Sequence, residues 1–342
     1  MLCRTYFIRL PRLTDRGKKW PRRLVPGRLP TLNNLKHVGY VFTPCGNFPL
    51  ILANYKDTTM PIESIYPEEL PAFSAKLKEA EYTLVDVRQP GEYREGHIPG
   101  SRLLPLPEIE GHLDELATTP NLVFYCRSGA RSQVAANLAQ ANLPAGTRIL
   151  NLIGGFTAWE GRPLADMPRL EVFAPGRESF DTTSQALLRA MELEKAAQLF
   201  YQAAESKATS PKMAATLATL GKVERTHARV IFHRLQRADA EYAHQNFETC
   251  FDGLSGDILE GGESLEAVVA RLGSLGPDGT DGDFCLSVTE LALMIETAAY
   301  DLYKNLAGVH AGTELEPVFL ELAEDELKHQ RLLVRLLPEC AA

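Results

Sequence analysis

The chain has 342 residues, enough for two domains, and its composition of 45% hydrophobic and 23% charged residues is that of a globular protein. Residues 1–59 carry a net charge of +9, whereas the remaining residues carry −17. This acidic body argues against binding to nucleic acid, and the lack of a long uninterrupted apolar stretch argues against a transmembrane helix or a membrane partner.

Residues 1–59 are rich in Arg and Pro and show neither helical nor strand periodicity. They lack the compact apolar segment of a secretory signal and the high Ser content of a transit peptide. Organised sequence begins at Met60. We therefore interpret residues 1–59 as an extension of the gene model beyond a physiological start at Met60. A real, disordered basic tail is the alternative.

Residues 60–166 alternate between helical and strand patterns. Such alternation predicts an α/β domain with a mostly parallel sheet flanked by helices. The expected helices cover residues 67–80, 130–141 and 155–161, and the expected strands cover residues 82–87, 122–126 and 148–152.

Residues 167–180 contain prolines and a glycine and are predicted to be a linker. Residues 181–342 then change to long amphipathic helices, which predict an all-α four-helix bundle. The Gly- and Asp-rich residues 239–283, with one short helix near 264–272, are long enough to cross such a bundle from end to end. The four long helices are expected at residues 183–208, 211–237, 284–308 and 314–337.

The six cysteines are scattered singly, and none forms a CxxC pair. This excludes a rubredoxin-type iron site built from this chain alone. Single cysteines in a chain of this length favour a reducing compartment over a disulfide framework, so we expect a cytoplasmic protein.

A reactive cysteine is predicted at Cys126, in the segment CRSGARS of residues 126–132. The segment follows a buried-type strand and opens a helix, so the thiol faces unpaired backbone N–H groups and the positive end of a helix dipole. Both favour the thiolate and lower the pKa of the cysteine. Gly129 permits a tight loop, and Arg127 and Arg131 add positive charge that suits an anionic sulfur donor.

This loop resembles that of a single-domain rhodanese, and the resemblance extends over about residues 62–165. The resemblance implies that Cys126 carries a persulfide taken from thiosulfate or another sulfane-sulfur donor and passes it to a thiol or cyanide acceptor. It also implies that Arg131 closes the loop and that Asp86 and Arg88 lie beside it. The other matching motifs are LVDVR at 84–88, Glu92, HIPG at 97–100 and GGFTAW at 154–159.

Two other functions are compatible with a loop of this kind. Related phosphatases place the arginine one residue further on, and here only four residues separate Cys126 from Arg131, which favours sulfur over phosphate. The second alternative is an inert rhodanese fold used only for binding, which the presence of the cysteine and both arginines disfavours.

The helical part contains an internal repeat of Glu-x6-Tyr followed by Glu-x2-His, displaced by 102 residues. Residues three apart on a helix share a face and can bind one ion together, and residues seven apart lie two turns apart on one face. Several carboxylates on apolar faces would repel one another unless cations neutralised them. The first copy is Glu194, Tyr201, Glu224 and His227, and the second is Glu296, Tyr303, Glu326 and His329.

Residues 181–337 resemble the ferritin-like domain of rubrerythrins, which use two non-haem iron ions to react with peroxide or oxygen. The resemblance implies that the four glutamates and two histidines of the repeat are ligands. It further implies that Glu224 and Glu326 bridge the ions and that Tyr201 and Tyr303 support the ligands. Rubrerythrins carry a further glutamate at the position of Ala299, and its absence here favours a centre like the symmetrical one of ferritins or bacterioferritins over a peroxidase.

The sequence thus predicts a rhodanese-type sulfurtransferase joined to a di-iron oxidoreductase domain that acts in oxidative stress. Because this chain has no rubredoxin-type site, the electrons would come from an external donor protein. The alternatives for the helical domain are a ferroxidase or iron-handling site, or a metal-stabilised dimerisation scaffold. Bundles of this type often pair through their faces, so we expect a homodimer.

Overall fold

The computed structural model describes residues 60–170, 182–208, 210–274 and 281–340, and two short segments near the N-terminus. Those segments are β1 (Tyr6–Phe7) and β2 (Val25–Pro26), which pair antiparallel. The chain divides into two units, Met1–Thr59 and Met60–Ala342. Most of residues 1–59 and of the predicted linker lie outside the described residues, so the interpretations of both stay predictions.

The first part of the larger unit is built on a five-stranded sheet in the order β3-β7-β6-β4-β5, in which every pair is parallel. The parallel sheet predicted from the alternating pattern is therefore confirmed. The short outer strands β3 and β5 were not predicted, because two or three residues carry too little periodicity to be recognised. The strands are β3 (Glu63–Ile65), β4 (Tyr82–Asp86), β5 (Arg102–Leu103), β6 (Asn121–Tyr125) and β7 (Arg148–Leu152).

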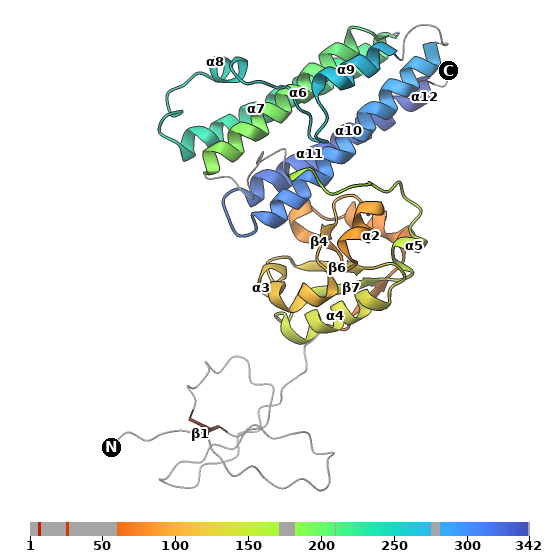
Figure 1. Ribbon diagram of the computed structural model, residues 1–342, viewed down its shortest axis with the longest axis vertical. Helices are drawn as coiled ribbons and strands as arrows, with labels where there is room; N and C mark the ends of the chain where they lie inside the picture. Colours follow the sequence, from red (N-terminus) through yellow and green to blue (C-terminus); the bar gives the residue numbers. More distant parts are fainter. Residues whose placement is uncertain are drawn as a thin grey trace. The chain divides into compact units, whose positions relative to one another are not determined.

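Helices cover both faces of this sheet, as predicted. One face packs with α3 and α4, which lie along it in Figure 1, around Val85, Leu122 and Phe124. The other face packs Leu84 and Val123 with side chains from α1 and α5. The α-helices are α1 (Leu70–Ser74), α2 (Pro90–Glu95), α3 (Leu113–Leu116), α4 (Ala130–Asn142) and α5 (Gly155–Ala158), and the 3₁₀ helices are Pro67–Glu69, Glu79–Glu81 and Leu106–His112.

The single helix predicted for residues 67–80 is wrong, because the chain forms two 3₁₀ turns and the short helix α1 there. The break has a local cause. The Glu81 carboxylate accepts a hydrogen bond from the backbone N–H of Lys78 at 2.8 Å, which caps a new turn at that point. The predicted helix 155–161 likewise ends early, at Ala158.

The described residues between 182 and 340 are mainly helical, and the four long helices were predicted within a few residues. Hydroxyl caps begin two of them, since Thr182 accepts from the N–H of Gln185 and Ser210 from that of Met213. The helices are α6 (Thr183–Glu205), α7 (Pro211–Ala238), α8 (Phe247–Asp252), α9 (Leu265–Ser274), α10 (Asp281–Val309), α11 (Glu316–Val334) and α12 (Leu337–Cys340).

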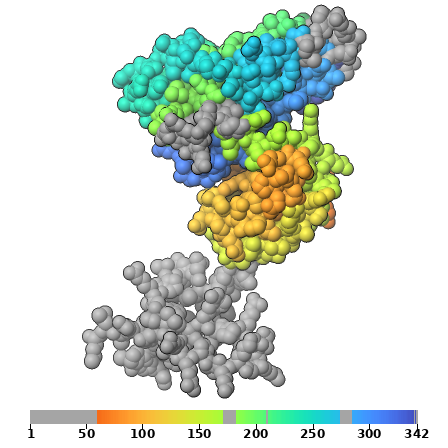
Figure 2. All heavy atoms as spheres, in the orientation of Figure 1, coloured from red at the N-terminus to blue at the C-terminus, as the bar shows by residue number. Residues whose placement is uncertain are grey.

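The long helices pack as two neighbouring pairs, α6 with α7 and α10 with α11 (Figure 1). All four contribute to one apolar cluster that includes Leu187, Ile231, Tyr303 and Phe319. In the segment between α7 and α10, α8 packs against α6 and α7, and α9 packs against α6; both lie on the face of the molecule seen in Figure 2. Within the described part of the chain, none of the helices combines the length and apolarity needed to cross a membrane.

Two cysteines of the helical part form a disulfide, Cys285–Cys340, with Cα atoms 5.2 Å apart. The expectation that the cysteines are all single is therefore wrong for this pair. The reason is tertiary: α12 folds back against α10 and brings together two residues that are 55 positions apart. Among the described residues, Cys126 and Cys250 are free.

Helix α10 also packs against the first domain through buried polar contacts. The Asp301 carboxylate accepts a hydrogen bond from the N–H of Gly100 at 2.7 Å and lies 3.2 Å from Nε2 of His97. Nearby, the Lys304 ammonium forms a buried ion pair with Glu79 at 2.9 Å. Because buried polar groups are stable only when paired, these contacts specify one arrangement of α10 on the first domain.

Substitution of Gly100 by alanine is expected to destabilise this packing. Gly100 has a φ of +75°, and an added Cβ would lie 2.4 Å from the Tyr300 ring. The left-handed backbone and the steric clash together should cost about 2–4 kcal/mol. Thermal unfolding of the full chain checks this, with Gly111→Ala as the matched control because a Cβ there meets no atom within 4 Å. Equal melting temperatures for the two variants would contradict the expectation.

Candidate functional site

Cys126 lies directly after β6, at the carboxyl edge of the parallel sheet, where open α/β sheets bind their ligands. Its side chain is 1% exposed, and the following residues Arg127 and Ser128 are exposed. Gly129 caps α4 with a φ of +99°, a left-handed conformation that lets the loop turn back over the sulfur. The local sequence therefore places the thiol at the floor of a short loop, as predicted.

The loop surrounds the sulfur with hydrogen-bond donors. The N–H of Gly129 donates to Sγ of Cys126 at 3.1 Å, and the Ser132 hydroxyl lies 3.5 Å from it. Burial by itself raises the pKa of Cys126. The hydrogen bonds from the Ser132 hydroxyl and from the amides of Ser132, Ser128 and Gly129 outweigh burial and bring this pKa below its usual value. The arrangement thus stabilises a thiolate.

A second glycine turn, at Gly154 and Gly155, supports the loop from below. The N–H of Phe156 donates to the carbonyl of Cys126 at 2.8 Å, and that of Thr157 donates to the carbonyl of Arg127 at 3.0 Å. A Cβ at Gly155 would lie 2.3 Å from the Cys126 carbonyl oxygen. This contact explains why the GGFTAW motif accompanies the cysteine loop.

The two loop arginines have different environments. Arg131 forms a two-pronged ion pair with Glu92, with both N–O distances 2.7 Å, which lowers the pKa of Glu92 to about 2. The pKa of Arg131 is raised, mainly by Glu92 and also by the adjacent Cys126. Arg127 projects from the exposed side of the loop. Glu92 therefore fixes the direction of one cation, while the other faces solvent.

Asp86 and Arg88 lie deeper than the loop, and both are buried. Arg88 binds the Asp86 carboxylate at 2.6 Å and the carbonyl of Gly96 at 2.8 Å, and its guanidinium stacks over the Phe156 ring at 4.3 Å. Among the hydrogen bonds of the described residues, none joins this pair to Cys126. Their contacts position the segments around the loop instead of touching the sulfur.

Sequence reasoning did not assign a role to Ser132 or Asn151, which complete the buried side of the loop. Oγ of Ser132 lies 2.6 Å from Oδ1 of Asn151 and 3.0 Å from the Gly129 carbonyl. Since a hydroxyl carries one proton, Ser132 can donate to only one acceptor at a time. The available signal was Asn151 itself, a polar residue inside the apolar strand β7.

The Ser132→Ala variant is expected to raise the pKa of Cys126, because it removes a hydroxyl donor that stabilises the thiolate. The rate of alkylation by iodoacetamide should fall several-fold at neutral pH, and its pH midpoint should move to higher pH. Ser128→Ala is the matched control, because that position donates through its backbone amide only. An unchanged pH midpoint in Ser132→Ala would mean that the hydroxyl serves Asn151 alone.

Comparison with known proteins agrees with this geometry. Residues 69–162 match the model of the rhodanese-like domain. A protein named sulfurtransferase from Allochromatium vinosum is 41% identical over 90 residues, which cover 26% of this chain and 81% of that protein. The protein YqhL of Bacillus subtilis is 34% identical over 112 residues, which cover 33% of this chain and 83% of that protein.

This chain belongs to the rhodanese family. A rhodanese-like domain protein from Staphylococcus aureus, a solved structure, is 28% identical, with coverage of 31% of this chain and 100% of that one and a TM-score of 0.27. Each of these matches covers about a third of the chain or less. They therefore concern the rhodanese domain, and the helical domain has to be interpreted from its own residues.

The helical domain brings together all six acidic and histidine side chains of the repeat. Each is buried in the middle of one of the four long helices. Their ligand atoms form three overlapping groups, in each of which all atoms lie within 4.8 Å of one another. The groups are Glu224 with His227 and His329; Glu224 with Glu296, Glu326 and His329; and Glu194 with His227 and Glu326.

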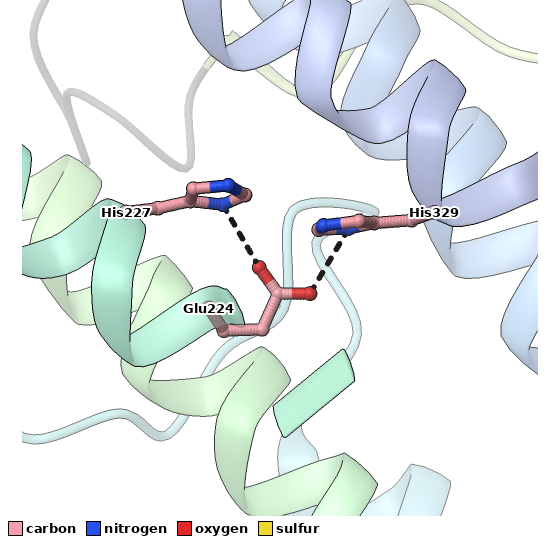
Figure 3. Close-up of side chains that lie close together, drawn as sticks. All are labelled: Glu224, His227 and His329. Carbon is pink, nitrogen blue, oxygen red and sulfur yellow. Dashed lines mark hydrogen bonds and ion pairs between the residues drawn. The ribbon is translucent and has the colours of Figure 1, made fainter. Parts of the chain in front are cut away.

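Glu224 lies between the two histidine rings (Figure 3). Its carboxylate oxygens are 3.2 Å from Nδ1 of His227 and 3.1 Å from Nδ1 of His329, and the rings stack with centroids 5.1 Å apart. Glu326 similarly belongs to a group with Glu194 and to a group with Glu296. Ligand atoms from both copies of the repeat therefore lie within 4.8 Å of each of these two glutamates.

Each repeat tyrosine donates to the first glutamate of the opposite copy. Tyr303 donates to Glu194 at 2.8 Å, and Tyr201 donates to Glu296. The spacing had placed Tyr201 on the same face as Glu194, but the tertiary pairing crosses between α6 and α10. The tyrosines therefore orient carboxylates across the domain.

The glutamates and histidines of the cluster are buried, so both desolvation and the attraction between carboxylates and imidazoles shift their pKa values. Burial raises the pKa of Glu194 to about 7. Burial alone would lower the pKa values of His227 and His329, but the carboxylates that face them raise both well above the usual value. In the absence of a cation, protons on the two imidazoles compensate part of the negative charge.

Two further acidic residues at the cluster were not predicted. Asp325 lies 3.1 Å from Nε2 of His227, a contact that orients the ring. Glu260, on the segment that precedes α9, is also buried close to the cluster, and its charge interacts with those of Glu194, Glu224 and Glu296. Asp325 belongs to no repeat, and Glu260 lies in a Gly-rich segment without periodicity, so neither carried a sequence signal.

Proposed function

We propose that the rhodanese domain is a sulfurtransferase that carries sulfane sulfur as a persulfide on Cys126. The observation that carries this proposal is the convergence of backbone amides and the Ser132 hydroxyl on a buried sulfur, which favours the thiolate. The names of the relatives that match this domain support the same reaction class.

With thiosulfate as donor, the Cys126 thiolate attacks the outer sulfur atom. A new S–S bond forms, the bond to the sulfonate sulfur breaks, and sulfite leaves with the electron pair. A thiol or cyanide acceptor then attacks the terminal sulfur and releases the thiolate. The positive charges of Arg127 and Arg131 suit an anionic donor, and the loop amides can stabilise the anionic persulfide.

The test is to incubate the full chain with thiosulfate and measure its mass, followed by thiocyanate formation from cyanide. We expect one added sulfur on the Cys126 peptide and loss of that sulfur when cyanide is added. A chain that hydrolyses p-nitrophenyl phosphate and gains no sulfur would instead indicate a phosphatase.

We further propose that the helical domain is a ferritin-like bundle that holds two non-haem iron ions. Four glutamates and two histidines on four helices are the ligand set of di-iron carboxylate bundles. The side chains present fit this group, because Nε2 of His329 is buried without a hydrogen-bond partner, and the repelling carboxylates need cations. Glu224 and Glu326 would bridge the ions.

Bound iron would supply redox chemistry toward peroxide or oxygen. Neighbouring residues would hold the ligands in place. Tyr201 donates to Glu296, and Tyr303 donates to Glu194. Asp325 orients His227. Because the described cysteines include no CxxC pair, an external protein would donate the electrons. We propose that the chain acts as a homodimer, because bundles of this type often pair through their faces.

Two alternatives share the same ligands: iron oxidation for iron handling, and a metal-stabilised scaffold. Iron quantification after anaerobic reconstitution, followed by peroxide and oxygen consumption, separates them. Peroxide turnover with an added electron donor is expected for the redox enzyme. Oxygen consumption only during Fe(II) uptake would favour iron handling, and bound metal without either reaction would favour the scaffold.

A further inference from the structure

The carboxyl group of Glu260 is buried without an adequate partner. The side chain is 3% exposed, and its Oε2 atom has no hydrogen-bond partner. Burying a carboxyl oxygen without a hydrogen bond costs free energy, and this cost is a large fraction of the free energy of unfolding of a typical domain. A residue of this kind usually has a function that offsets its cost.

The segment that carries Glu260 is held firmly on α6. The ammonium group of Lys195, the residue after the ligand Glu194, donates to the carbonyls of Phe251 at 3.0 Å and Leu254 at 2.6 Å. Gly256 then passes close to the Lys195 side chain with a φ of +60°. The segment therefore approaches the metal-ligand cluster from the side of α6.

The turn at Glu260 also packs against α10. Leu259 is buried in the apolar cluster that contains Tyr201 and Ile295. A Cβ at Gly261 would lie 3.4 Å from the Cβ of Ala298, which shows a close approach of the two backbones. Glu260 is thus held between the two helices that carry Glu194 and Glu296.

The carboxylates of the cluster are near enough to act on Glu260. Burial is the main cause that raises the pKa of Glu260 well above its usual value, and the charges of Glu194, Glu224 and Glu296 raise it further. Mutual repulsion among five buried carboxylates is relieved most effectively by multivalent cations.

A cavity gives solvent and ions a route to Glu260. A cavity of about 430 Å³ is lined by Glu260 and Gly261 from the crossing segment, Ile295 and Asp301 from α10, and His97 from the rhodanese domain. Ile295 and Asp301 lie on the same stretch of α10 as Glu296, so the cavity runs along the part of this helix that also carries a cluster residue. Ions and water can approach Glu260 through this cavity.

We propose that Glu260 is a seventh ligand of the metal centre. It is contributed by the segment between α7 and α10, at a point where Glu260 lines this cavity. The inference rests on the proposed function of the helical domain. The three tight groups of ligand atoms among the described residues do not include Glu260. The proposal therefore requires the Glu260 side chain to rotate toward the cluster when metal binds.

The test compares the full chain with its Glu260→Gln and Glu266→Gln variants, each stripped of metal and titrated with Co²⁺ without oxygen. Glutamine keeps the size of the side chain and removes the charge, so the variant should fold. Glu266 is the matched control, since it is exposed on the same segment. Calorimetry measures affinity and stoichiometry, and the visible spectrum of Co²⁺ reports its coordination.

We expect the Glu260→Gln substitution to lower the affinity for the more weakly bound Co²⁺ ion at least about tenfold and to change its visible absorption band. The Glu266→Gln variant should bind Co²⁺ as the wild type does. Equal affinities and identical spectra for all three proteins would overturn the role of Glu260 and leave the metal centre intact. A wild-type chain that binds no Co²⁺, Mn²⁺ or Fe²⁺ would instead refute the metal centre itself.

Discussion

Replacement of Cys126 by serine is expected to lower the rate of thiocyanate formation from thiosulfate and cyanide by at least about a thousandfold. A serine hydroxyl is not ionised at neutral pH and cannot form a persulfide. The backbone amides that donate to Sγ could donate to the serine oxygen instead, so the fold should be retained. Steady-state kinetics and circular dichroism of the full chain measure the two effects.

The matched control is Cys250→Ser, which alters the other free cysteine of the described residues. Cys250 lies on α8 and is half-buried, and burial raises its pKa, so it is a poor nucleophile. Full activity is expected in this variant. Retained sulfur transfer in Cys126→Ser, or its loss in Cys250→Ser, would refute the assignment of the nucleophile.

Replacement of both Glu224 and Glu326 by alanine is expected to abolish metal binding by the helical domain. Each of the three tight groups of ligand atoms contains at least one of these two carboxylates, so their loss removes a ligand from every group. Inductively coupled plasma mass spectrometry after anaerobic reconstitution with Fe(II) should find two ions in the wild type and none in the variant.

Thermal unfolding provides a second measurement, because metal that binds only the folded chain stabilises it by about 2.7 kcal/mol at a hundred times the dissociation constant. This increase in stability should be absent from the double variant. The control is Glu205→Ala with Glu290→Ala, two exposed glutamates on α6 and α10. Undiminished iron in the Glu224 and Glu326 variant would refute their bridging role.

Helix α10 connects the two candidate sites physically. Its residues Glu296 and Tyr303 face the cluster of glutamates and histidines, whereas Tyr300, Asp301 and Lys304 face the rhodanese domain. A helix turns by about 100° per residue, so Asp301 and Tyr303, two residues apart, point to nearly opposite sides of α10. The same rigid element therefore supports the packing of both domains.

Much of both candidate sites was predictable, because their residues lie in local patterns. The cysteine loop is contiguous, and its chemistry follows from a strand, a glycine and a helix start within seven residues. The histidine and glutamate cluster could be recognised because helical spacing and a displacement of 102 residues repeat every member. Spacing alone could not assign the partner of each tyrosine, since that depends on how α6 and α10 face each other.

By itself, the sequence determined the parallel α/β domain, the four long helices, Cys126 and the repeated Glu, Tyr and His positions. Local periodicity and adjacency encode these features, because they depend on residues close together in the chain. Only the tertiary structure decided the Cys285–Cys340 disulfide, the support of Cys126 by Asn151, the Asp325–His227 contact and the burial of Glu260. Each of these joins segments that are distant in sequence, and the packing of the whole unit alone brings them within bonding distance.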